Sequence, residues 1–323
     1  MSIRITCILL ITTTLCAPMP AGIIPEDLIV RIIEYDREIR DISLRADVYI
    51  PLDNQWHLME YEWRYAGGRE YLRAQIRLRK SGTYELSRIQ NVATVFDGED
   101  MWLFEWHGNP ERVTSSARRT YLDEESFNIY PTVVTSMAYH AKQSGRSTLG
   151  EILKGADSVV VRSEKETING HECLVVEAYH IDYLDDMQAY VNLLVWVDMQ
   201  RDYRPLRWIM CYDYGESKGW GALRQEGYDI KLGQFGGRWI PIESKRQWYL
   251  SSVVKPESMS DDEWQSLSLQ HRREQGHLQV KKMNNYQLFK ADVSSLRVNQ
   301  GLTRSDFRIE LPEGCVVWDD LEQ

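Results

Sequence analysis

Residues 59–78 of the chain read MEYEWRYAGGREYLRAQIRL. Every second residue from Met59 to Tyr65 is large and apolar or aromatic, and the residues between them are charged. After the pair Gly67-Gly68 the alternation resumes at Leu72. A period of two is typical of a strand with one buried face, and a Gly-Gly pair suits the positive φ values of a two-residue hairpin turn. This stretch therefore predicts two paired antiparallel strands.

The same pattern recurs along the chain. Asp97-Gly98, Asn169-Gly170 and Gly236-Gly237 are further turn pairs between alternating segments. Such turns need no helical crossover between the strands that they join. We therefore predict a mainly β (α+β) protein with a large, twisted antiparallel sheet and a few short helices. Further strands are predicted at residues 42–50, 88–96, 101–106, 158–165, 171–178, 191–197, 206–214, 228–232, 239–248, 277–289 and 307–311.

Helical patterns are few. Pro25 to Tyr35 has Pro in the first turn and apolar residues on one face, which predicts a helix. A helix led by the capping pair Ser260 and Glu263 is predicted to reach about Gln275. The strand period is lost over residues 109–155, which we interpret as a partly helical insert with helices near 133–143 and after residue 148. With no linker or repeat, residues 22–323 are predicted to form one domain.

The composition excludes one class of function. The chain has 323 residues and a formal net charge of −10, and it has no basic cluster. Nucleic-acid binding requires Lys and Arg for phosphate contacts, so we exclude it. The 11 Trp and 18 Tyr suit a half-wet surface, because their rings are apolar at one end and polar at the other.

Residues 1–21 resemble a secretory signal peptide. Arg4 precedes an uncharged stretch that ends near Leu15 and is too short to span a bilayer. Leu15 occupies the position where a lipid-anchoring motif requires a small residue, so anchoring through Cys16 is not predicted. The sequence therefore predicts a periplasmic or secreted protein.

Motifs with potential chemistry are weak. Gly215 to Gly219 fits G-x-S-x-G, but the long helix that a nucleophile elbow needs is missing. The segment from His180 to Asp186, with His171, is interpreted as a solvated loop, because it lacks the spacing of a calcium loop. The run Asp123 to Glu125 is interpreted as an exposed acidic turn or the start of a helix. We predict no catalytic residue, no metal site and no cofactor.

Three cysteines follow the leader: Cys173, Cys211 and Cys315. An odd number leaves at least one thiol free. Cys173 and Cys211 lie in predicted strands, where a single Cys is usually a small apolar core residue. A bridge between these two stays open at this point.

Large apolar and aromatic side chains on alternating strand positions are the candidates for a ligand site. Each could equally be a core residue, but together they exceed what a few short helices would cover. A partly covered apolar concavity is a typical site for a lipid or an acyl chain. The candidates are Met59, Tyr61, Trp63, Trp102, Phe104, Trp196, Trp208 and Met210.

Three stretches carry a family resemblance: VFDGEDMWLF at 95–104, LVWVDMQRDYRPLR at 194–207 and GRWIPIES at 237–244. They resemble the LolA/LolB-like superfamily, and in particular secreted proteins described as outer-membrane lipoprotein-sorting proteins. The resemblance implies an incomplete β-barrel, a half-barrel lidded by helices, that holds the acyl chains of lipoproteins in transit. It also implies transport without catalysis, with the residues 25–35 and 133–143 as lids.

Two other functions remain open from the sequence. The same fold could act as a sensor similar to RseB-type regulators of envelope stress, which bind a partner protein. A secreted glycan-binding or hydrolytic β protein would instead show rows of exposed Trp on a flat sheet and a cleft with paired carboxylates.

Overall fold

The computed structural model describes part of the chain. The described residues are 25–52, 55–66, 69–79, 86–96, 101–107, 114–120, 149–184, 189–213, 222–267, 271–272, 275, 277–308, 311 and 315–319. The predicted signal peptide, Cys16 and the predicted helix at 133–143 lie outside these residues and stay predictions. No described helix has the length and hydrophobicity needed to cross a membrane.

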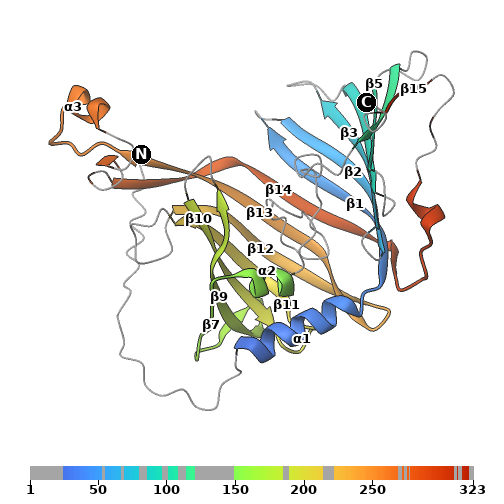
Figure 1. Cartoon of the computed structure of the whole chain (residues 1–323), viewed down its shortest axis with the longest axis horizontal. Helices are drawn as coiled ribbons and strands as arrows, with labels where there is room; N and C mark the ends of the chain where they lie inside the picture. Colours follow the sequence, from blue (N-terminus) through green and yellow to red (C-terminus); the bar gives the residue numbers. More distant parts are fainter. Residues whose placement is uncertain are drawn as a thin grey trace.

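The described strands form one 15-stranded sheet (Figure 1). The strands of its first half are β1 (Asp41–Leu52), β2 (Gln55–Ala66), β3 (Arg69–Arg79), β4 (Leu86–Phe96), β5 (Met101–His107) and β6 (Thr114–Thr120). The second half comprises β7 (Ser158–Val161), β8 (Glu166–Ile168), β9 (His171–Leu184), β10 (Ala189–Asp198), β11 (Arg204–Asp213), β12 (Ala222–Phe235), β13 (Arg238–Val254) and β14 (His277–Val298), and β15 (Val316–Asp319) closes the list. The predicted mainly β fold class is confirmed.

The chain enters this sheet in the middle. The strand order is β15-β6-β5-β4-β3-β2-β1-β14-β13-β12-β11-β10-β9-β7, with β8 paired to β9. The chain thus runs from the centre to one edge, crosses to β7 at the far edge and returns as an antiparallel meander to β14 beside β1. Its two ends do not pair with each other, so the sheet is an open, incomplete barrel, as Figure 1 shows.

Hairpin chemistry explains the register. Asn169 and Gly170 have φ values of 52° and 82°, and Gly236 and Gly237 have 56° and 79°. These are the left-handed conformations that a two-residue turn requires. The pairs Gly67-Gly68 and Asp97-Gly98 lie outside the described residues, but the strands on either side of each pair antiparallel, as predicted.

Three helices and one 3-10 turn accompany the described strands. They are α1 (Pro25–Arg37), α2 (Leu149–Gly155), α3 (Asp261–Ser266) and η1 (Arg304–Phe307). The first two match the predicted helices at these places. The capping box of α3 is present, but α3 does not run unbroken to Gln275 as predicted, because Leu267 is extended and its N–H bonds the carbonyl of Trp264. His271, Arg272 and Gln275 are helical again.

The C-terminal segment differs from the prediction. Of the strand predicted at 307–311, the described residues Phe307, Arg308 and Leu311 belong to no strand. Thr303 donates two hydrogen bonds to Asp306 at the start of η1, which ends at Phe307. The side chain of Phe307 is instead buried against Ala66, Tyr71 and Val95. Three described strands were missed: β8, β6 within the insert and β15. The last two pair in parallel. The sequence of β6, TSSARRT, has no apolar alternation that could reveal it.

Candidate functional site

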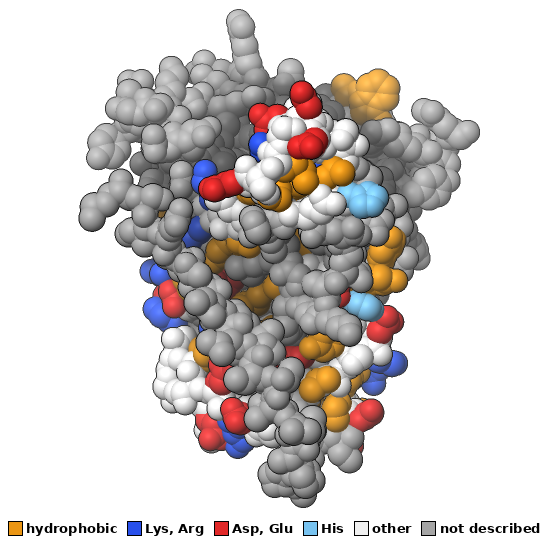
Figure 2. Space-filling view, turned by 90° about the vertical axis from the view of Figure 1, so that its left-hand side faces the viewer, with side chains coloured by type: hydrophobic (Ala, Val, Ile, Leu, Met, Phe, Trp, Pro, Cys, Tyr) orange, Lys and Arg blue, Asp and Glu red, His pale blue; other side chains and the backbone are white. Residues whose placement is uncertain are grey.

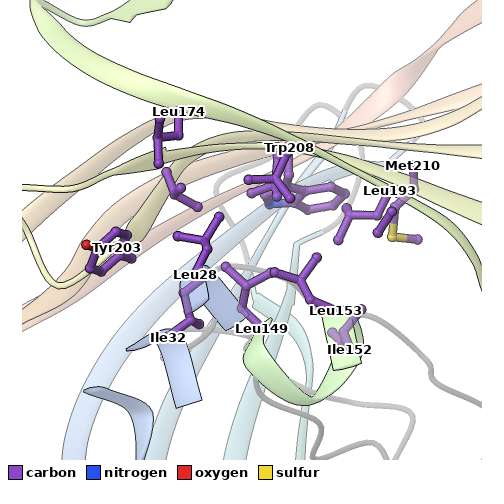
Figure 3. Close-up of a cluster of buried hydrophobic side chains, with 14 of the residues drawn as sticks. Leu28, Ile32, Leu149, Ile152, Leu153, Leu174, Leu193, Tyr203, Trp208 and Met210 are labelled. Atoms are coloured by element: carbon purple, nitrogen blue, oxygen red, sulfur yellow. The ribbon is translucent and has the colours of Figure 1, made fainter. Parts of the chain in front are cut away.

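Two short helices cover one face of the sheet over strands β9, β10 and β11. Leu28 and Ile32 of α1 are buried there, as are Leu149, Ile152 and Leu153 of α2. Figure 3 shows these side chains pointing toward Leu193, Trp208 and Met210 from the strands. We call this face the helix side and the other face the opposite side. The strand side chains of the helix-side cluster are Val161, Leu174, Val176, Ala178, Ala189, Val191, Leu193, Val195, Val197, Trp208, Met210, Tyr212 and Ile230.

Two glycines allow the close contacts in this cluster. A Cβ on Gly227 would lie 2.1 Å from Nε1 of Trp208, so the indole lies directly against the β12 backbone. A Cβ on Gly150 would lie 2.5 Å from Cγ1 of Ile33, so α1 and α2 touch at this point. Both positions therefore depend on a glycine for space.

The C-terminal end of α1 is tethered by polar contacts. Oδ1 of Asp36 lies 2.5 Å from Nη1 of Arg204, and both side chains are buried, with 7% and 4% of their surface exposed. Nε of Arg204 also donates to the carbonyl oxygen of Trp239. Oδ2 of Asp36 and Nη2 of Arg204 are buried without a hydrogen-bond partner. Burial of this incompletely bonded ion pair is costly, and it joins the helix end to the β11 and β13 starts.

Two further contacts support the same helix. Arg238 pairs with Glu38, just beyond the end of α1. Tyr203 accepts a hydrogen bond from Arg31, and its ring lies 5.7 Å from that of Tyr35. The C-terminal part of α1 is therefore held by residues at the starts of β11 and β13 and in the turn before β11.

The strand register divides the eight candidate residues between the two sides. Directly opposed residues share a side, and residues two apart on a strand do so as well. Such steps lead across the sheet from Trp208 to Trp63. The residues between them are, in order, Gly227, Arg246, Gln287, Phe289, Val48, Ala46 and Tyr61. The helix side therefore includes Tyr61, Trp63, Trp208 and Met210.

The other candidates lie elsewhere. Trp102 and Phe104 are on the opposite side, where Trp102 packs beside Tyr71 and Val95, and Phe104 packs with Ala93. Trp196 is buried on the opposite side of β10, next to Cys173, Val175 and Leu206. Met59 pairs with Val48 in the register, and its side chain lies outside the described part.

The helix-side candidates do not form a single cluster. Trp208 and Met210 pack under α1 and α2, whereas Tyr61 and Trp63 pack with residues of β1, β13 and β14. All four are at most 7% exposed. The residues that the sequence reasoning missed are Leu28, Ile32 and Leu153, which fill the space over the strands; their helical periodicity was visible, but not the strands on which they pack.

The described thiols do not form a nucleophilic site. Cys173, Cys211 and Cys315 are free, so no Cys173–Cys211 bridge forms. Burial raises the pKa of Cys173 to about 11 and that of Cys211 to about 12. Both are therefore protonated near neutral pH, whereas a nucleophilic cysteine needs a lowered pKa.

The histidine candidates lie in two separate contacts. Nδ1 of His180 is 3.0 Å from Oδ2 of Asp157, and its Nε2 is 3.7 Å from Oδ2 of Asp213. The second, His171, contacts Arg201 and Asp198. Residues 180–184 belong to β9 and not to a loop, which corrects the sequence interpretation.

Metal binding finds no support in the described residues. The two carboxylates beside His180 approach different ring nitrogens and do not converge on one point. More generally, no group of His, Cys, Asp and Glu side chains in the described part could hold a metal ion. Gly215 to Gly219, Asp123 to Glu125, Asp185 and Asp186 lie outside that part.

Comparisons with known proteins concern the fold alone. No family model and no curated protein matches the chain. Among solved structures, it is similar to a DUF1329 family protein from Desulfovibrio piger, with 12% identity, a TM-score of 0.46, and 88% of this chain and 95% of that one covered. It is also similar to the Pseudomonas aeruginosa MucA/MucB complex, with 10% identity, a TM-score of 0.25, and 86% and 99% covered. A third similar structure is a putative outer membrane lipoprotein-sorting protein domain from Vibrio parahaemolyticus, with 12% identity, a TM-score of 0.47, and 88% and 97% covered.

Proposed function

We propose that this chain is a periplasmic or secreted binding protein that holds a hydrophobic ligand on its helix side. The ligand class is a lipid or the acyl chain of a lipoprotein, and the process would be outer-membrane lipoprotein sorting. In this proposal Trp208 and Met210 line the ligand site, and Tyr61, Trp63 and Met59 extend it along the sheet. The protein binds and releases its ligand without catalysis.

The observation that carries the proposal is the cover of the helix side. In the described cluster, the buried side chains that cover the apolar face of β9, β10 and β11 come from α1, α2 and Tyr203 in the turn before β11. Undocking α1 would uncover a continuous apolar surface, which is the default site for an apolar ligand.

The energetics allow an acyl chain to replace α1. Burial of one Leu or Ile side chain contributes about 1.5–3 kcal/mol, and α1 buries two of them fully, Leu28 and Ile32. An acyl chain gains about 0.8 kcal/mol per buried CH₂, so about ten groups would gain about 8 kcal/mol. The ligand therefore offsets the loss of the helix contacts, and the Asp36 tether would hold the end of α1 as a hinge.

Gly150 and Gly155 provide a matched test. Both lie in α2, but a Cβ on Gly155 meets nothing within 4 Å, whereas a Cβ on Gly150 collides with Ile33. Gly150→Ala should push α1 away and raise the population of the open state. Because apparent affinity scales with the fraction of the competent state, Gly150→Ala should bind a fluorescent fatty acid more tightly, and Gly155→Ala should match the wild type.

Native mass spectrometry completes the test. The full chain, expressed in a host with membranes, should carry a lipid or acylated peptide, and the occupancy should be higher for Gly150→Ala. A Gly150→Ala protein that is less stable but binds no more fatty acid would contradict a displaceable lid. A protein that carries no lipid and takes none up on titration would contradict the ligand class.

A second candidate function is the partner-binding sensor. The hairpin of β13 and β14 extends past the sheet body to α3 (Figure 1) and carries exposed apolar residues, among them Leu250, Val254 and Val280. Figure 2 views this end of the molecule, where hydrophobic and acidic side chains lie next to each other around α3. A protein partner that protects this hairpin from hydrogen exchange, with no lipid bound, would favour the sensor.

The glycan-binding alternative has less support. Of the tryptophan side chains that the structure describes, Trp63, Trp196 and Trp208 are buried, and only Trp318 is highly exposed. A row of exposed Trp on a flat sheet is therefore not seen in the described part.

A further inference from the structure

A bulge in β14 opens a polar cavity on the opposite side of the sheet. Ser43 pairs with Arg297 and Arg45 pairs with Asp292, so four residues of β14 face the single β1 residue between them. Bulges of this kind re-aim side chains and are frequent beside functional sites. The resulting cavity has a volume of about 420 Å³ and is lined mainly by polar side chains.

Three arginines surround Ser43 in this cavity. Arg64 is the partner of Ser43 on β2, Arg297 is its partner on β14, and Arg45 lies two residues along β1 on the same side. Directly opposed side chains on adjacent strands have Cβ atoms about 4.5–5.5 Å apart. The register therefore places the Cβ atoms of three arginines beside one small side chain. The guanidinium of Arg64 itself contacts Glu62, the carbonyl oxygen of Asp306 and the ring of Tyr71.

The two carboxylates of the cavity already have partners. Glu62 accepts a charge-assisted bond from Nη2 of Arg64 at 2.5 Å. Oδ1 of Asp292 accepts bonds from the backbone N–H and the hydroxyl of Ser294, and these bonds lower the pKa of Asp292. The lining thus has three positive and two negative groups, in a chain whose overall charge is −10.

The remaining donors have no acceptor among the described residues. The guanidinium of Arg45 has no hydrogen bond or ion pair there, and only its backbone N–H donates, to Ser295. Arg297 uses Nη1 alone, for the carbonyls of Ser294 and Leu296, which leaves Nε and Nη2 without an acceptor. Ser43 also lines the cavity. Donors from two strands therefore line one cavity.

We propose that this cavity, which we call the bulge pocket, binds a phosphate group, either of a small phosphate ester or of a phospholipid headgroup. Guanidinium groups form paired, charge-assisted bonds with phosphate oxygens, and a tetrahedral phosphate accepts donors from several directions at once. Arg45 on β1 and Arg297 on β14 would bind the phosphate oxygens, with Ser43 between the two arginines. Arg64 would hold Glu62 away from the anion.

A charge ladder alone does not account for these residues. Ordinary cross-strand pairs match opposite charges on a solvated face, as Lys231 and Glu243 do elsewhere in the sheet. In the bulge pocket Arg45 is opposed to Asp292 on β14 and to Glu62 on β2, and its charge helps to lower the pKa of Asp292. No hydrogen bond among the described residues joins Arg45 or Arg297 to a carboxylate, and the bulge adds a cavity that a ladder does not need. The pocket lies on the side away from α1 and α2, so it is independent of the proposed ligand site.

The test is a titration of the full chain by calorimetry with glycerol 3-phosphate, and sedimentation with vesicles of phosphatidylglycerol or of phosphatidylcholine alone. Arg45→Gln and Arg297→Gln should each raise the dissociation constant at least about tenfold, as expected for a lost charge-assisted bond. Lys154→Gln removes one exposed positive charge from α2 and is the control, with an expected change below about twofold. Circular dichroism verifies the fold of each variant.

The outcomes separate the two phosphate sources. Binding of glycerol 3-phosphate that both Arg variants weaken supports a soluble phosphate ester. Binding of phosphatidylglycerol vesicles alone, weakened by the same variants, supports a lipid headgroup. Absence of both, or binding that Arg45→Gln and Arg297→Gln leave unchanged, overturns the proposal. None of these results depends on fatty-acid binding by the helix side.

Discussion

The buried pair of Asp36 and Arg204 is expected to hold α1 on the sheet. The side chain of Arg204 is 4% exposed, and in Asp36→Ala it loses its one carboxylate partner among the described residues. It keeps one bond, from Nε to the carbonyl of Trp239. Removal of one partner from a buried ion pair typically costs about 3–5 kcal/mol, because an uncompensated charge remains buried. We expect a loss of this size in the free energy of unfolding.

An exposed ion pair with the same N–O distance serves as the control. Lys231 and Glu243 are also 2.5 Å apart, but their side chains are 65% and 33% exposed. Surface pairs contribute about 0–1 kcal/mol, so Glu243→Ala should lower the free energy of unfolding by no more than that. The comparison therefore contrasts a buried and an exposed pair of a basic and an acidic side chain at the same N–O distance.

Urea unfolding followed by tryptophan fluorescence measures both losses, since Trp208 lies under α1. Replacement of both partners, Asp36→Leu with Arg204→Met, should recover most of the loss, because an apolar pair of similar volume often substitutes for a buried ion pair. If Asp36→Ala costs no more than Glu243→Ala, the tether does not hold α1. A double variant as unstable as Asp36→Ala would show that the lost contacts are not electrostatic.

Three further predictions follow from the packing. Gly227→Ala should lower the free energy of unfolding by about 1–3 kcal/mol through overpacking against Trp208, and it should shift the fluorescence of Trp208. Gly155→Ala should do neither in the same urea assay, and equal effects of the two variants would refute the close contact. In the native protein a thiol reagent should label Cys315, which is partly exposed, and should spare Cys173 and Cys211 until urea unfolds the chain; labelling of all three at one rate would contradict their burial. The free energy of unfolding should fall as the pH rises from about 9 through 11 and 12. The buried thiols of Cys173 and Cys211 stay protonated in the folded state, whereas the unfolded thiols, with an ordinary pKa of 9.0, ionise and favour unfolding. Urea midpoints at pH 8 and pH 10.5 measure this decrease, which should be smaller in Cys211→Ala.

Local sequence rules predicted most strands, but not how the two halves of the sheet meet. The turns at Asn169-Gly170 and Gly236-Gly237 fix the register of their own hairpins, because a two-residue loop leaves no freedom. The central pair of β1 and β14 joins segments about 250 residues apart, such as Ala46 and Ala291, and no turn specifies it. Periodicity therefore identified the strands, and only the long-range pairing set the order.

The same limit applies to the candidate site. Trp196 and Trp208 both occupy alternating strand positions in the sequence, yet they face opposite sides, because Trp208 is opposed to Val195 and not to Trp196. Arg45 and Arg297 come together only through the central pair and its bulge, and no local sequence pattern indicates that they lie close to each other. Residue type thus indicated an apolar site. Which of the candidate residues share one face of the sheet depends on the register between strands that are distant in the sequence.

The two halves of the sheet are covered on different sides, and this bears on how a lid could open. Under β9, β10 and β11 the cover is α1 and α2 on the helix side. Near β3, β4 and β5 it is the C-terminal segment, through Leu302 and Phe307, on the opposite side. Undocking α1 therefore leaves the packing of the C-terminal segment intact.

Proteins open in local units, and each local opening costs less than the free energy of global unfolding. Because the two halves have separate covers, α1 can open as such a unit. Gly150→Ala should accordingly raise hydrogen exchange in the described residues of α1 and α2 and leave β3, β4 and β5 protected; exchange that rises uniformly would mean that the lid and the sheet unfold as one.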